Sequence, residues 1–189
     1  MGRPKEFLQG FSIFELIVMA LMASLGLATK PIIVPLTHMI TGPLFIPGGA
    51  VAGGFYMLWI VLAAGIVNKR GVATLTAFIQ ALIVIITGSF GSHGIISIVT
   101  YTIPGLMVDV IFLLFRRKIE KNYEFFLAGV IANLSGTYLT NIVFFRLPMI
   151  PLILSLSCGI LSGGIGGIIA YQINYRLKKI GFGDGFYEK

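Results

Sequence analysis

The sequence predicts an all-α fold, a single bundle of six transmembrane helices within residues 1–189, with both termini in the cytoplasm. Three observations predict it. The chain is 57% hydrophobic and 11% charged, so it has too little polar surface to cover a soluble domain. Its uncharged stretches reach the roughly 20 residues that a helix needs to cross a bilayer. Twelve of its 14 Lys and Arg residues lie in four clusters outside these stretches.

The helices are expected at the apolar stretches, with approximate bounds 11–29, 50–67, 72–88, 94–115, 125–145 and 150–175. The basic clusters precede the first stretch, follow the second and fourth, and end the chain. Basic residues mark cytoplasmic connections, so both termini and these two turns are assigned to the inside. The beginning also fits a cleavable signal peptide. Cleavage would leave an odd number of spans, so we favour a retained first helix.

The first helix has small residues at every fourth position, Ala20, Ser24 and Ala28. This spacing places them on one face, where small side chains let another helix approach closely. The face could pack within the bundle or dock a different membrane subunit, and both alternatives stay open. Glu15, one turn into this helix, is expected to pair with a cation at a helix end or to contact a subunit.

The first outer connection, residues 30–49, has four prolines and ends in Gly48-Gly49. Proline removes a helical donor and clashes with the preceding turn, so we expect no regular helix here. The segment is nevertheless apolar. It is interpreted either as a lid folded over a pocket or as an interfacial connector.

Polar and aromatic side chains in the second to fourth helices are candidates for solute binding, because polar groups are costly in hydrocarbon. Gln80 lies in the third helix and Tyr101 near the outer end of the fourth, and His93 lies in the turn between them. Trp59, with Tyr56 beside it, can add an aromatic wall. Asp109 lies nearer the inner side, so we expect it to pair with a helix-end cation or to contact a subunit.

The fifth helix carries Asn133, Thr137 and Asn141 at spacing four, with Arg146 at its outer end. This stripe leads to the outer surface, where a pocket for an outside solute would open. Asn133, the deepest, could instead bond a neighbouring helix, and Arg146 could simply snorkel to the interface. The glycines of the sixth helix are expected to pack inside the bundle; they are Gly159, Gly163 and Gly167.

Several function classes lack their sequence motifs. There is no G-x-x-x-x-G-K-[ST] phosphate loop, no H-E-x-x-H and no G-x-S-x-G elbow, so catalysis is unsupported. Two histidines far apart in the sequence do not suggest a metal site. The net charge of +7 lies at the ends of apolar spans rather than along one face, which argues against nucleic-acid binding. We expect a non-catalytic protein without a metal or cofactor.

Four segments carry a family resemblance: YMLW at 56–59, NKRGVA at 68–73, PGLMVD at 104–109 and LAGVIAN at 127–133. With six spans and a small-residue stripe in the first helix, residues 10 to 175 resemble the S component of an energy-coupling factor vitamin transporter. The segments themselves are similar to the YkoE-type branch, which is linked to thiamine and hydroxymethylpyrimidine.

The resemblance implies a substrate-binding subunit of an ATP-driven importer in the plasma membrane of a prokaryote. It would bind a vitamin or precursor and associate with a transmembrane coupling subunit and two ATPase subunits, and its coupling face would be Ala20, Ser24 and Ala28. Helix 3 has no acidic residue, and a buried cation needs compensation, so a neutral or anionic solute fits better than thiamine. The alternative is a stand-alone secondary transporter or channel.

Overall fold

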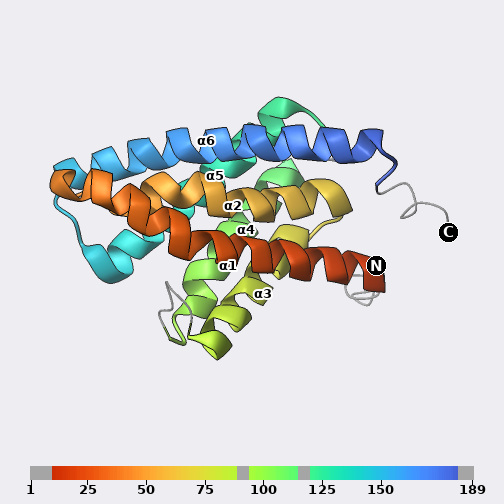
Figure 1. The fold of residues 1–189 in the computed structure, drawn as a ribbon, viewed down its shortest axis with the longest axis horizontal. Helices are drawn as coiled ribbons and strands as arrows, with labels where there is room; N and C mark the ends of the chain where they lie inside the picture. Colours follow the sequence, from red (N-terminus) through yellow and green to blue (C-terminus); the bar gives the residue numbers. More distant parts are fainter. Residues whose placement is uncertain (1–9, 89–93, 115–119, 183–189) are drawn as a thin grey trace.

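A computed structural model describes residues 10–88, 94–114 and 120–182. Within these ranges the chain forms six α-helices and no β-strand (Figure 1), so the all-α prediction is confirmed there. A 3-10 turn, η2 (Gly42–Leu44), follows the first helix, and a π-helical segment, η3 (Asn141–Phe145), continues the fifth. The helices are α1 (Ile13–Thr41), α2 (Gly48–Val67), α3 (Val72–Thr87), α4 (Ser97–Leu114), α5 (Asn122–Thr140) and α6 (Met149–Lys179).

Helix α2 lies at the centre of the bundle. It contacts α1, α3, α5 and α6, and its residues 60–67 are all buried. Figure 1 shows α6 running along α2, with α1 on another side, α3 below α1, and α4 passing behind. The start of α1 and the end of α6 lie at the same end of the molecule (Figure 1). All six helices therefore contribute to one hydrophobic core.

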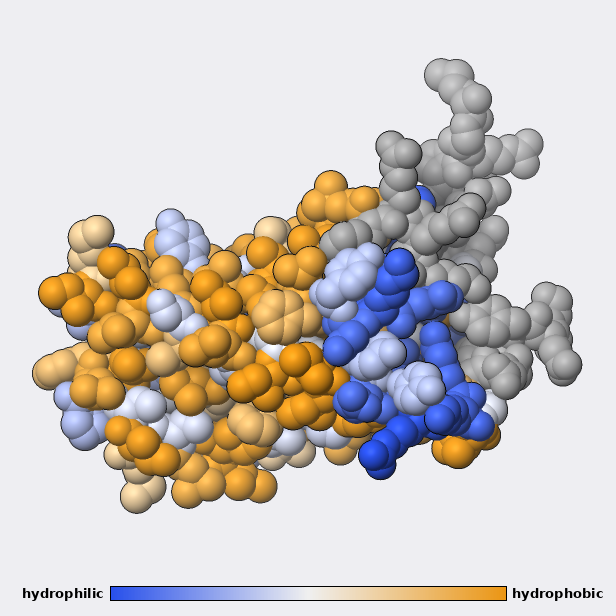
Figure 2. Space-filling model, turned by 90° about the horizontal axis from the view of Figure 1, so that it is seen from above, coloured by the Kyte–Doolittle hydropathy of each residue, from blue (hydrophilic) through white to orange (hydrophobic). Residues whose placement is uncertain are grey.

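The outer surface of the bundle is that of a membrane protein. Five helices are long and apolar enough to cross a bilayer, whereas α3, at 16 residues, is shorter. Figure 2 shows apolar surface over most of one face, with the hydrophilic residues gathered at the end that carries both termini. Exposed cations from two connections and from the last turn of α6 lie at this end; they are Lys69, Arg70, Lys121, Arg176, Lys178 and Lys179.

The glycines of α6 bring it close to two helices. A Cβ on Gly163 would lie 2.4 Å from the Gly129 carbonyl oxygen of α5, and one on Gly166 would lie 2.1 Å from the Gly54 carbonyl oxygen of α2. Both contacts are with backbone, so a side chain could enter only if the helices separated. The expected packing role inside the bundle is thus present at Gly163. Gly159 has more room, because its nearest contact would be 3.4 Å.

The expectation that residues 30–49 form no regular helix is wrong for most of the segment. Helix α1 continues through Pro31 and Pro35 to Thr41. The two prolines are four residues apart, so their missing donors fall on one side, and membrane helices tolerate proline when side chains and neighbouring helices support the backbone. Here Thr37 Oγ1 donates to the Gly48 carbonyl at 2.9 Å and fastens α1 to α2. Only residues 42–47 connect the two helices.

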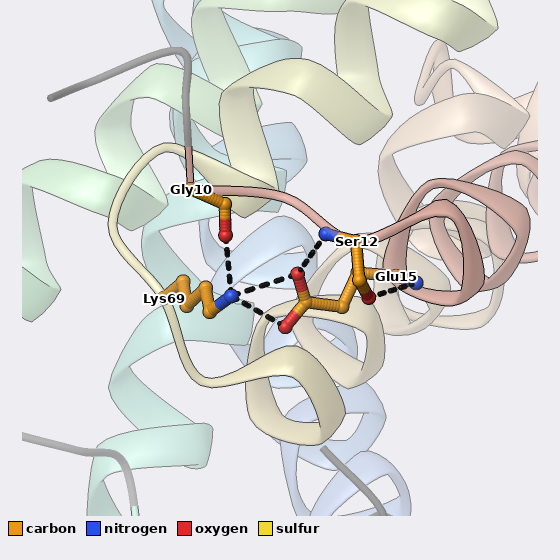
Figure 3. Close-up of polar contacts among 4 residues, drawn as sticks. All are labelled: Gly10, Ser12, Glu15 and Lys69. Carbon is orange, nitrogen blue, oxygen red and sulfur yellow. Dashed lines mark hydrogen bonds and ion pairs between the residues drawn. The ribbon is translucent and has the colours of Figure 1, made fainter. Parts of the chain in front are cut away.

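Glu15 forms the expected pair with a helix-end cation. Its carboxylate is buried at the start of α1 and lies 2.7 Å from the Nζ of Lys69, in the turn between α2 and α3 (Figure 3). The same carboxylate accepts a hydrogen bond from the Ser12 amide at 2.7 Å, and Lys69 also donates to the Gly10 carbonyl (Figure 3). The start of α1 is therefore fixed to the turn between α2 and α3.

Of the two alternatives for Asp109, a pair with a helix-end cation is not found among the described residues, and a contact with a subunit stays a prediction. The Asp109 carboxylate instead accepts hydrogen bonds from Thr74, in the first turn of α3. The backbone amides at a helix start have no partner within the helix and attract negative charge. Capping of the α3 start therefore explains why an acidic residue lies at the inner end of α4, and no bound ligand is needed to explain it.

Candidate functional site

A cavity of about 750 Å³ lies between all six helices, toward the end of α1 and the start of α2. Its walls come from the second half of α1, the first half of α2 and the facing parts of the other four helices. All these parts lie at the end opposite both termini. The lining residues with polar side chains are Lys30, His38, Tyr56, Gln80, Thr100, Tyr101, Thr137, Thr140, Asn141 and Ser155.

Lys30 is the charged residue in this wall. Its Nζ lies 3.8 Å from the ring centroid of Tyr101 and 4.5 Å from that of Tyr56, which is within cation–π range. Tyr56 is itself fixed, because its hydroxyl donates to the Gly49 carbonyl at 2.9 Å. The ammonium group is thus held against two aromatic faces contributed by α2 and α4.

The short connection after α1 forms another part of the wall through Phe45, Ile46 and Pro47. Side chains at the end of α1 fix it, since Thr41 Oγ1 donates to the Ile46 carbonyl at 2.9 Å and the Gly48 amide donates to His38 Nδ1 at 3.4 Å. Residues 45–47 form part of the cavity wall, as the lid alternative expects. Residues 30–41 continue helix α1, which neither alternative included.

Gln80 enters the cavity wall from α3 and is almost fully buried. Its Nε2 packs against Gly26 of α1, where a Cβ would lie 2.2 Å away. That nitrogen is buried and has no hydrogen-bond partner among the described residues, although the amide group has two donors and an acceptor to satisfy. Gly26 therefore makes room for the Gln80 amide, whose nitrogen packs against α1.

Four of the eight residues predicted to bind substrate line this cavity: Gln80, Tyr101, Thr137 and Asn141. Asn141 also supports the wall, because its Oδ1 accepts a hydrogen bond from the Leu147 amide at 2.9 Å. It begins the π-helical segment η3, and such segments are frequent at functional sites.

Three other predicted residues lie elsewhere. Asn133 is fully buried and donates to the Ala50 and Gly159 carbonyls, both at 2.9 Å, so the interhelical alternative describes it. Trp59 packs against the main core. Arg146 is exposed and ends η3 with a left-handed backbone. His93 lies outside the described residues.

Sequence reasoning missed several lining residues, including His38, Phe45, Thr100, Thr140 and Ser155. One signal was available. Lys30, Val34 and His38 are spaced by four and all line the cavity, as residues on one helix face do. The four prolines predicted a loop instead of a helix, so the shared face of these three residues was not predicted.

The small-residue stripe of α1 faces outward. Ala20, Ser24 and Ala28 are all exposed, while Ala23 points into the core. The Ser24 hydroxyl donates to the Ala20 carbonyl of its own helix at 2.9 Å, so it presents no free polar group. The stripe therefore does not pack within the bundle, which was one of the two alternatives for it. Docking of a different membrane subunit stays a prediction.

Comparison with known proteins places this architecture among transport proteins. The model of a family described as the permease component of an ABC-type cobalt transport system matches residues 14–135, well over half of the chain. The chain belongs to this family. No curated protein matches the sequence significantly. Membership of this permease family and the apolar helices identify the chain as a multi-pass membrane protein of a transport system.

A solved structure gives the fold of this family member. The protein described as "Crystal structure of an S-component of ECF transporter" is similar to the chain with a TM-score of 0.76 over 93% of this chain and 89% of that one. Sequence identity is 20%. The permease family member therefore has the fold of an S component.

Cobalt itself finds no ligand set among the described residues. They contain no group of three or more His, Cys, Asp or Glu side chains that could hold a metal ion. Divalent cobalt would be bound by such nitrogen, sulfur and oxygen ligands. The cavity offers one imidazole, hydroxyls, amides and aromatic rings instead, which suits an organic solute.

Proposed function

We propose that this chain is the substrate-specific S component of an energy-coupling factor importer for a small organic solute, a vitamin or vitamin precursor. The observation that carries the proposal is the cavity of about 750 Å³ enclosed by all six helices. Its volume is in the range of small-molecule sites, and its lining is apolar with a few polar groups, as such sites are. The S-component fold and a transport family support it.

The proposed orientation has six membrane-crossing helices and both termini in the cytoplasm of a prokaryotic cell. The exposed cations near the termini support it, because basic residues favour the cytoplasmic side. Helix α3 is short for a span, but helices shorter than the bilayer can be accommodated by local thinning. In this orientation the cavity lies in the outer half, where it meets solute from outside.

The proposed partners are a transmembrane coupling subunit and two ATPase subunits. The chain has no phosphate-binding loop, so ATP would be hydrolysed by partners and the chain would have no catalytic role. The outward stripe of Ala20, Ser24 and Ala28 is the proposed contact with the coupling subunit. Its small side chains leave a shallow strip on α1 that another helix could enter.

The proposed solute is neutral or anionic. No acidic residue lines the cavity in the part of the chain that the structure describes, so a cation such as thiamine would lack a counter-charge there and would lie near Lys30. Hydroxymethylpyrimidine, the neutral compound of the YkoE-like branch, and anionic vitamins remain within the proposed class.

Uptake into liposomes tests the function. We would reconstitute the chain alone and with its coupling and ATPase subunits, load ATP inside, and measure uptake of labelled hydroxymethylpyrimidine and a panel of labelled vitamins. Uptake that needs both the partners and ATP is expected. The control is the same complex with its ATPase phosphate-loop lysines replaced. Uptake by the isolated chain without ATP would contradict the proposal and indicate a stand-alone transporter.

A further inference from the structure

The cavity wall contains a cation whose charge no acidic group offsets. Among the described residues the ion pair present is that of Lys69 with Glu15, at the other end of the molecule, and no Asp or Glu lines the cavity. The other basic side chain in the wall, His38, accepts a hydrogen bond from the Gly48 amide at its Nδ1. Lys30 is thus the source of net charge in the wall.

The tyrosines hold this cation without neutralising it. The rings of Tyr56 and Tyr101 attract the ammonium group through their electron-rich faces, but an aromatic ring carries no net charge. A buried ammonium group has up to three donors, and rings are weak substitutes for oxygen acceptors. The arrangement therefore keeps Lys30 in place with capacity for an anion.

The rest of the wall sets the character of that anion. Phe45, Ile46, Met57, Ile60 and Phe145 form much of the remaining surface, so the bound molecule needs an apolar or aromatic body. One lysine offsets one negative charge, whereas a phosphate monoester carries close to two at neutral pH. Charge balance therefore favours a carboxylate.

We propose that the cavity binds an amphipathic carboxylic acid, whose carboxylate pairs with Lys30 between Tyr56 and Tyr101 and whose body fills the apolar part. This inference rests on the proposed function and narrows its substrate class. Gln80 lies in the same wall and adds an uncharged polar side chain to it. Pairing between charges is stronger where the surrounding protein reduces screening by water than at an open surface.

Three probes of one shape and different charge test this assignment on the purified full chain in detergent: 2-naphthoate, 2-naphthamide and 2-naphthylmethylamine. Dissociation constants are obtained from the dependence of the thermal unfolding midpoint on probe concentration. We expect naphthoate to bind about thirtyfold more tightly than the amide, as for a close buried charge pair, and the amine to bind most weakly.

The variants Lys30→Met and Lys30→Arg test whether the charge of Lys30 causes the preference for naphthoate over naphthamide. Methionine should remove the preference for naphthoate over naphthamide, and arginine should keep most of it. Arg146→Met is the matched control, because this exposed cation at the same end lies outside the cavity wall, and it should leave the preference unchanged. Elution from size-exclusion chromatography and helical circular dichroism verify that each variant is folded.

Equal binding of the three probes, preference for the amine, or no binding of any would overturn the assignment, as would a preference that survives in Lys30→Met. A second measurement uses no chosen probe: mass spectrometry of the molecule that the wild-type chain retains from a metabolite extract should show a carboxylic acid. A neutral or cationic molecule, or none, also overturns it. ATP-dependent uptake of a neutral solute would refute this inference and leave the S-component function intact.

Discussion

Asp109 of α4 accepts two hydrogen bonds from Thr74 of α3, at 2.8 Å from the backbone amide and 2.5 Å from the hydroxyl. The residue before α3 is Gly71, which has no side chain to cap the helix. Asp109 therefore provides from a neighbouring helix what a local Ser or Asp ordinarily provides at a helix start. The α3–α4 pair is joined at its inner end by this contact.

Replacing Asp109 with Ala should destabilise the start of α3. Loss of a capping oxygen costs about 1 kcal/mol, up to about 2 in proteins, so amide hydrogen exchange over residues 72–75 should accelerate and the thermal midpoint should fall. Thr74→Val removes the hydroxyl bond alone and should have a smaller effect. A double mutant with fully additive effects would contradict direct coupling between the two side chains.

Lys69→Met should destabilise the chain more than Arg70→Met. Methionine at residue 69 leaves the Glu15 carboxylate, which is 1% exposed, without its cation, and a buried charge that loses its partner is costly. The penalty should be about 1–3 kcal/mol, since Lys69 itself is half-exposed and water can partly replace it. Thermal unfolding in detergent measures both variants.

Arg70 is the matched control for this prediction, an exposed cation next in sequence. Adding Glu15→Gln to Lys69→Met should restore part of the lost stability, because the amide carries no charge to leave buried. Equal midpoints for Lys69→Met and Arg70→Met would show that the ion pair contributes little.

The two glycines Gly159 and Gly163 should respond differently to alanine. A Cβ on Gly163 meets the Gly129 carbonyl oxygen at 2.4 Å, whereas one on Gly159 meets nothing closer than 3.4 Å. Gly163→Ala must push α5 and α6 apart, at a cost of about 1–3 kcal/mol. Gly159→Ala should be neutral or stabilising by up to about 1 kcal/mol, from helix propensity. Unfolding midpoints that fall equally in both variants would contradict the geometry.

The agreement between the expected and the observed helices shows which features the sequence can predict. Apolar length and charge clusters predict the helices because a bilayer imposes both requirements on the chain. They fail at Pro31 and Pro35, where helix α1 continues through both prolines, as membrane helices can. That error concealed the face on which Lys30 and His38 line the cavity.

The candidate site was only half predictable for a related reason. Periodicity places Asn133, Thr137 and Asn141 on one face of α5, but it does not give their depth relative to the cavity. The Asn133 amide nitrogen donates to the Ala50 and Gly159 carbonyls and is satisfied within the bundle, whereas its Oδ1 is buried without a hydrogen-bond partner among the described residues. Which polar residue is used for packing depends on the neighbouring backbone, which the pattern of one helix does not reveal.

Ser24→Leu should weaken assembly with the coupling subunit and leave solute binding intact. The Ser24 side chain is exposed on α1 and bonded to its own helix, so leucine fits the monomer but fills the shallow strip between Ala20 and Ala28. Interfaces of small residues depend on close backbone approach. Co-purification with the coupling subunit should drop severalfold and ATP-dependent uptake with it. Ser157→Leu, at an exposed serine of α6, is the matched control and should assemble normally. Normal assembly of Ser24→Leu would move the coupling face elsewhere.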